Sequence, residues 1–90
     1  MRLPWVGSET INLGEKITVN GAVEGGTAPY TYAYYYKRST NTKWKVLGTE
    51  FGTETTAKLK PTSAGSFDIR VVVKDSAGKT STKLMTATAK

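Results

Sequence analysis

Apolar and polar residues alternate along most of the chain, a period of two that is typical of strands with one buried face. The clearest stretch covers residues 67–74, where alternate positions hold Phe67, Ile69, Val71 and Val73. Alternation recurs in six further stretches, at residues 10–13, 16–23, 30–36, 43–46, 57–60 and 80–90. No window has apolar residues at the i, i+3, i+4, i+7 spacing of an amphipathic helix. The pattern predicts an all-β fold of about seven strands.

Clusters of glycine, proline, asparagine and aspartate separate these stretches at short intervals. Each predicted strand has a single apolar face, and two sheets packed face to face bury such faces fully. A small closed barrel, the alternative, usually has more glycines inside its strands. We therefore expect an immunoglobulin-like β-sandwich of about seven antiparallel strands over residues 10–90. Residues 1–9 are expected to be a linker or the remnant of an artificial boundary.

The tyrosine-rich stretch at residues 30–36 places its even-numbered and odd-numbered side chains on opposite faces of the predicted sheet. The apolar positions of the other strands favour the even-numbered tyrosines as the inward set. We expect Tyr32 and Tyr34 to lie in the core, and Tyr36 and Trp44 to close one end of the sandwich. Phe67 stands where such folds often carry a corner tyrosine, so no hydroxyl-to-backbone bond is expected there.

Tyr35 is out of phase with the even-numbered tyrosines, so we expect it to point outward. The strand expected to pair with it would place Val72 and Arg70 on the same face. An aromatic patch exposed in this way is a candidate contact surface for a neighbouring module or a ligand. With the nearby aromatic and basic residues included, the candidate interaction surface consists of Tyr35, Val72, Arg70, Trp44, Lys43 and Lys45.

The chain is basic, with 13 Lys+Arg against 7 Asp+Glu and a net charge of +6. The basic residues are spread along the chain, and their one local concentration is Lys37, Arg38, Lys43 and Lys45. Scattered lysines on strand faces and beside turns protect sheet edges and keep a domain soluble. We therefore expect no specific nucleic-acid binding. A small domain that binds nucleic acid or another anion remains the alternative of third rank.

The composition excludes much of catalytic chemistry, because the chain has neither cysteine nor histidine. Disulfides, thiol nucleophiles, histidine triads and zinc sites of the usual ligand types are therefore ruled out. The carboxylates show no calcium-loop spacing, and Asp75 is expected to shape a hairpin turn with its side chain. Gly25 and Gly26 are expected in a turn rather than in a phosphate-binding loop. We expect no enzyme activity, no cofactor, no metal and no membrane insertion, since no apolar run approaches about 18 residues.

Two segments carry a family resemblance. Residues 25–32 read Gly-Gly-Thr-Ala-Pro-Tyr-Thr-Tyr, and residues 65–78 read Gly-Ser-Phe-Asp-Ile-Arg-Val-Val-Val-Lys-Asp-Ser-Ala-Gly. Together they resemble bacterial immunoglobulin-like repeats and repeats of the polycystic-kidney-disease (PKD) type. The tyrosine-rich strand, followed by Lys37-Arg38-Ser39 and Trp44, is similar to modules of Gram-positive surface proteins. The resemblance covers residues 17–90, and the run 34–36 replaces the Trp-x-Phe-Gly-Asp-Gly stretch of PKD domains, so the likeness is to the immunoglobulin-like relatives.

The resemblance implies a secreted or cell-wall-attached protein built from repeated modules with a spacer or adhesive role. The first hypothesis is accordingly a non-catalytic module whose partners are neighbouring modules of the same protein, with another surface protein or a polysaccharide as further partners. The second hypothesis is a carbohydrate-binding module that uses the aromatic side chains of Tyr35 and Trp44 together with the adjacent basic loop.

Overall fold

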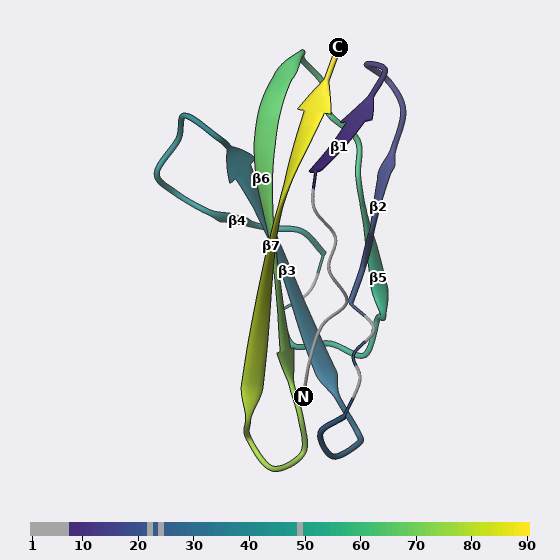
Figure 1. Ribbon diagram of the computed structural model, residues 1–90, viewed down its shortest axis with the longest axis vertical. Helices are drawn as coiled ribbons and strands as arrows, with labels where there is room; N and C mark the ends of the chain where they lie inside the picture. Colours follow the sequence, from purple (N-terminus) through teal and green to yellow (C-terminus); the bar gives the residue numbers. More distant parts are fainter. Residues whose placement is uncertain (1–7, 22, 24, 49) are drawn as a thin grey trace.

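The computed structural model describes residues 8–90 except 22, 24 and 49 (Figure 1). Its described part contains seven strands and no helix. The strands are β1 (Ser8–Ile11), β2 (Ile17–Asn20), β3 (Thr31–Arg38), β4 (Lys45–Val46), β5 (Thr56–Leu59), β6 (Gly65–Lys74) and β7 (Thr80–Ala89). The prediction of an all-β fold of about seven strands is therefore confirmed.

The strands form two sheets. The larger sheet has the order β1-β7-β6-β3-β4, and the smaller one pairs β2 with β5. Figure 1 shows the long strands β3, β6 and β7 at the centre of the molecule, with β2 and β5 side by side next to them. The β3–β6, β6–β7, β3–β4 and β2–β5 pairs are antiparallel, as predicted.

The first strand departs from the prediction in direction and in position. β1 runs parallel to β7, with Ser8 opposite Thr86 and Ile11 opposite Ala89. The two strands are the first and last in the described chain, so no short turn joins them and nothing forces an antiparallel pair. β1 also ends at Ile11 rather than at Leu13, because the chain turns there. Of the predicted linker at residues 1–9, residues 1–7 lie outside the described part and the last two begin β1.

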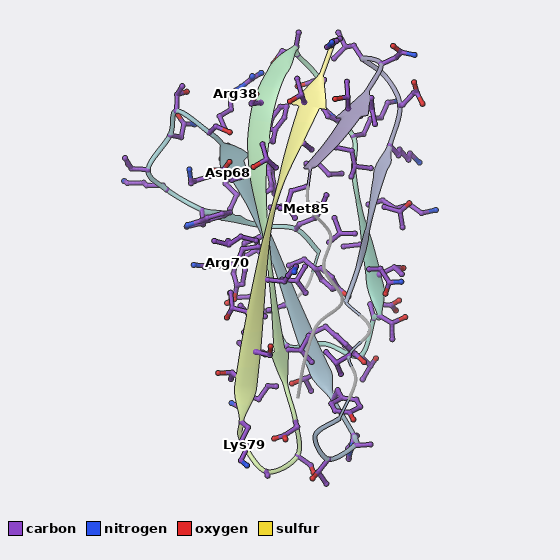
Figure 2. The ribbon with its side chains drawn as sticks, in the orientation of Figure 1. Arg38, Asp68, Arg70, Lys79 and Met85 are labelled. Atoms are coloured by element: carbon purple, nitrogen blue, oxygen red, sulfur yellow. The ribbon has the colours of Figure 1, made fainter. Side chains whose placement is uncertain are left out.

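The two sheets share one hydrophobic core in a sandwich-like arrangement. The inward positions of β3, β6 and β7 follow the predicted alternation, and Tyr32 and Tyr34 belong to the core. In Figure 2 the labelled Met85 lies on the side of the larger sheet that faces β2 and β5. The buried cluster consists of Ile17, Val19, Tyr32, Tyr34, Leu59, Phe67, Ile69, Val71, Val73, Met85, Ala87 and Ala89.

One end of the core is covered differently from the prediction. Tyr36 packs against the core, but Trp44 is not part of that cluster. The Arg38 guanidinium lies 4.7 Å from the centroid of the Phe67 ring and donates a hydrogen bond to the carbonyl of Ala64 at 3.0 Å. Arg38 therefore covers this end with its stem and its cation, as long basic side chains at the rim of a core commonly do.

The hairpin between β6 and β7 is shaped by Asp75, as expected from the sequence. Its carboxylate oxygen Oδ1 accepts hydrogen bonds from the backbone N–H groups of Ala77 at 3.0 Å and Lys79 at 2.9 Å. Gly78 has φ +87°, a left-handed conformation that glycine adopts without strain. This turn fixes the register of the two longest strands.

Candidate functional site

The outer face of the larger sheet, on the side away from β2 and β5, carries a row of four side chains across four strands. Leu84 lies opposite Arg70, Arg70 opposite Tyr35, and Tyr35 opposite Val46. In β6 and β7 these positions alternate with the buried core residues, and β3 and β4 continue the same register, so the row faces away from the core. Figure 2 shows Arg70 on this outer side, opposite to Met85.

Arg70 is held between two aromatic rings. Its guanidinium carbon lies 4.6 Å from the centroid of the Tyr35 ring and 4.7 Å from that of Trp44. Both distances are within the range of cation–π attraction. The side chain is half-buried, and its Nε atom is itself buried and has no hydrogen-bond partner among the described residues. The stack therefore positions a cation without satisfying its hydrogen-bonding capacity.

Tyr35 is fixed at both of its ends. Its ring contacts Arg70, and its hydroxyl donates a hydrogen bond to Oε2 of Glu50 at 2.9 Å. Burial raises the pKa of Tyr35, the hydrogen bond to Glu50 and the charge of that carboxylate raise it further, and the charge of Arg70 opposes the change. The sequence predicts an outward Tyr35, and the structure places it on the outer face but half-buried rather than fully exposed.

The neighbouring cation, Lys37, is already paired. Its ammonium lies 2.8 Å from Oδ2 of Asp68 and 5.2 Å from the centroid of the Trp44 ring. Ser39 donates a second hydrogen bond to Asp68, to Oδ1 at 2.8 Å. The hydrogen bond from Lys37 and then that from Ser39 lower the pKa of the Asp68 carboxyl. Lys37 and Asp68 thus neutralise each other, whereas no carboxylate of a described residue lies within ion-pair distance of Arg70.

The structure brings together three of the residues that the sequence singles out, Tyr35, Arg70 and Trp44. Val72 lies on the same face, two residues along β6 from Arg70 and opposite Ala33. Val72 is half-buried and Ala33 is fully buried, so this part of the face is less exposed than predicted.

The two lysines of the candidate surface are placed differently. Lys45 pairs with Tyr36 and therefore projects on the other face of the sheet at its edge. Lys43 is exposed in the segment before β4. Neither lysine is in contact with the stack through a cation–π pair, a role that Lys37 and Arg70 fill instead.

Several members of this face are missed by sequence reasoning. Lys37, Asp68 and Leu84 share the parity of Tyr35 or Arg70, so alternation was a usable signal for them. Glu50 and Phe51 lie in the connection between β4 and β5, and no local pattern places a connecting segment over a sheet face. The Lys74 ammonium lies 5.4 Å from the centroid of the Phe51 ring, which extends the cationic and aromatic surface along the face.

A second feature is a small cavity of about 150 Å³ between β3, β5 and the segment after β4. Its lining residues include the core tyrosines Tyr32 and Tyr34 together with Glu54 and Lys58. Among the described residues no group of three or more histidine, cysteine, aspartate or glutamate side chains is placed to hold a metal ion. Within the same residues, no helix is long and apolar enough to cross a membrane.

Comparison of the chain with protein-family models found no match, and a search of the curated proteins found no similar sequence. Function is therefore inferred from the residues and their geometry.

Proposed function

We propose that the chain is a non-catalytic, immunoglobulin-like module of a secreted or cell-surface bacterial protein, and that it acts as a mechanical spacer with an adhesive face. The strand order supports the immunoglobulin-like assignment. The third, sixth and seventh strands are neighbours in one sheet, and the second and fifth strands pair in the other. Immunoglobulin-like sandwiches distribute their corresponding strands between two sheets in the same way.

The observation that carries the spacer function is the parallel pairing of β1 with β7. Tension along a chain of modules enters this domain through β1 and leaves it through β7. Because the two strands are parallel, that tension slides one strand along the other and loads all hydrogen bonds between them at once. The pairing continues past the strands. The N–H group of Lys90 donates a hydrogen bond to the carbonyl of Ile11 at 3.0 Å, and the N–H group of Leu13 donates one to the carbonyl of Lys90 at 2.8 Å.

Single-molecule stretching of the domain between flanking reference modules tests this proposal. Leu13→Pro removes the N–H group that donates to the carbonyl of Lys90 beside the β1–β7 pair, and Leu47→Pro removes the N–H group that donates to the carbonyl of Tyr34, outside the stretched pair. We expect Leu13→Pro to lower the unfolding force strongly, and Leu47→Pro to leave it near the wild-type value even when both lower thermal stability alike. Equal forces for the two variants would show that the β1–β7 pair does not bear the tension.

A further inference from the structure

The outer face of the larger sheet combines exposed apolar side chains with its aromatic and cationic stack. Leu84 is 61% exposed, Val46 is 43% exposed and Phe51 is 40% exposed. Leu84 and Val46 stand at the two ends of the row that contains Arg70 and Tyr35. Strands in a sheet are about 4.8 Å apart, so the row is about 14 Å long. An extended segment of roughly five residues is long enough to span it.

Arg70 gives this face a definite chemical preference. Stacking between Tyr35 and Trp44 holds the guanidinium in place before any partner arrives. The Nε atom is buried and lacks a hydrogen-bond partner within the described part of the chain, so a carboxylate would have to bind the two terminal nitrogens, and no described carboxylate pairs with the group. A guanidinium is a planar fork that matches a carboxylate with two parallel hydrogen bonds. Trp, Tyr and Arg are also the residues that dominate protein–protein binding energies.

We propose that this face binds a protein segment in which an acidic residue lies between apolar residues, with the carboxylate on Arg70 and the apolar side chains on Leu84 and Val46. This partner class goes beyond the spacer function and does not depend on the β1–β7 pair bearing tension. The contacts of Arg70 cover one face of each of the two rings, which leaves less aromatic surface for stacking a sugar. The two exposed aliphatic side chains also fit apolar groups better than hydroxyls.

A second copy of this chain is a poor occupant of the face. In a symmetric pair the same patch meets itself, so the two Arg70 side chains would approach each other. The net charge of +6 adds repulsion between the copies. An acidic partner gains from both features, because the uncompensated cation and the overall charge then attract it.

The experiment is a selection of short random peptides displayed on phage, carried out in parallel on the wild-type domain and on two variants. Arg70→Gln removes the cation from the proposed site, and Lys58→Gln removes one positive charge from β5 in the other sheet. We expect wild type and Lys58→Gln to select peptides with Asp or Glu between apolar residues, and Arg70→Gln to lose them. No enrichment on wild type, or the same peptides on Arg70→Gln, would overturn the proposal.

A selected peptide is then titrated into the isotope-labelled domain and followed by NMR. Arg70→Gln and replacement of the acidic residue of the peptide by its amide should each weaken binding by about tenfold or more, as loss of a charged hydrogen bond does. Leu84→Ser changes an exposed side chain and should also weaken binding while the domain stays folded. NMR chemical-shift changes confined to β2 and β5 would contradict a binding site on this face. Binding of polygalacturonate, together with failure of every peptide to bind, would contradict a protein partner.

Discussion

The hydroxyl of Tyr34 donates a hydrogen bond to the main-chain carbonyl of Glu54 at 2.8 Å, which joins β3 of the larger sheet to the segment that enters β5 of the smaller one. The Tyr34 side chain is 2% exposed. Burial, and then electrostatic interactions with Tyr32 and with Glu54, raise the pKa of Tyr34 to about 12. The neutral hydroxyl is therefore the form that links the sheets, and ionisation would place a charge inside the core.

Tyr34→Phe removes this hydroxyl and should lower the free energy of unfolding by about 1 kcal/mol at neutral pH, as loss of one hydrogen bond does. A group whose folded pKa is raised contributes stability that is complete below its unfolded pKa and is lost as the pH rises through the folded value. The wild-type domain should thus lose stability between pH 10.0 and about 12, and the variant should lose less. Urea unfolding at neutral and alkaline pH measures both effects, and identical alkaline losses would contradict this role of Tyr34.

Tyr34 and Tyr32 also explain why position 21 holds a glycine. A Cβ atom on Gly21 would lie 2.6 Å from the Tyr34 hydroxyl oxygen and 2.9 Å from Cδ1 of Tyr32. Gly21→Ala should therefore lower the free energy of unfolding by about 1–3 kcal/mol, the usual cost of overpacking a core. Thermal unfolding measures the loss. The double variant with Tyr34→Phe lacks the nearest clashing atom, so its loss should be smaller than the sum of the two single losses. Strict additivity would show that Tyr34 does not cause the clash.

Alternation predicted the strands correctly, because each side chain of a strand points to one of only two faces of the sheet. Within β6, a period of two placed Val71 inward and Arg70 outward, and in β3 it separated Tyr34 from Tyr35. Which of the two alternating sets points inward followed from burial, since the set with more apolar side chains faces the core. This is why the core and the outward Tyr35 could be predicted from the sequence.

The remaining features depend on contacts between segments that are distant in the sequence. β4 has only two residues, so alternation could not show that Trp44, just before it, turns onto the outer face against Arg70. Tyr34 donates a hydrogen bond to a carbonyl 20 residues away, and no pattern within β3 indicates that acceptor. No pattern within β1 carries the direction of its pairing with a strand at the other end of the chain. Such features follow from topology, which a local pattern does not determine.

Asp75 should make the domain sensitive to acid. The carboxyl is buried, which by itself raises its pKa, but hydrogen bonds from the backbone N–H groups of Lys79, Thr27 and Ala77 outweigh burial and lower the pKa below the ordinary value of 3.8. A lowered folded pKa contributes stability that is present above the unfolded pKa and is lost as the pH falls through the folded value. Acid should therefore weaken the β6–β7 turn.

Asp75→Asn keeps one side-chain oxygen but removes the charge that these N–H groups stabilise. We expect a lower urea midpoint than wild type at neutral pH, and a smaller further decrease between about pH 5 and pH 2. The residual acid dependence of the variant should include that of Asp68, whose pKa is also lowered. A variant curve parallel to the wild-type curve throughout this range would show that Asp75 does not contribute to acid sensitivity.

The stack around Arg70 should contribute to stability without any bound partner, because its two cation–π contacts lie within one half-buried cluster. A double-mutant cycle between Arg70→Met and Trp44→Leu isolates this contact, since methionine retains much of the apolar stem and loses the charge. We expect a coupling free energy of about 0.5–2 kcal/mol, measured by urea unfolding. Tyr35→Phe is the matched control: it removes the hydrogen bond to Glu50 and keeps the ring, so the coupling of Arg70 to Trp44 should persist in that background. A coupling near zero would mean that Arg70 is held by its stem alone, and the guanidinium would then not be fixed in advance for a carboxylate.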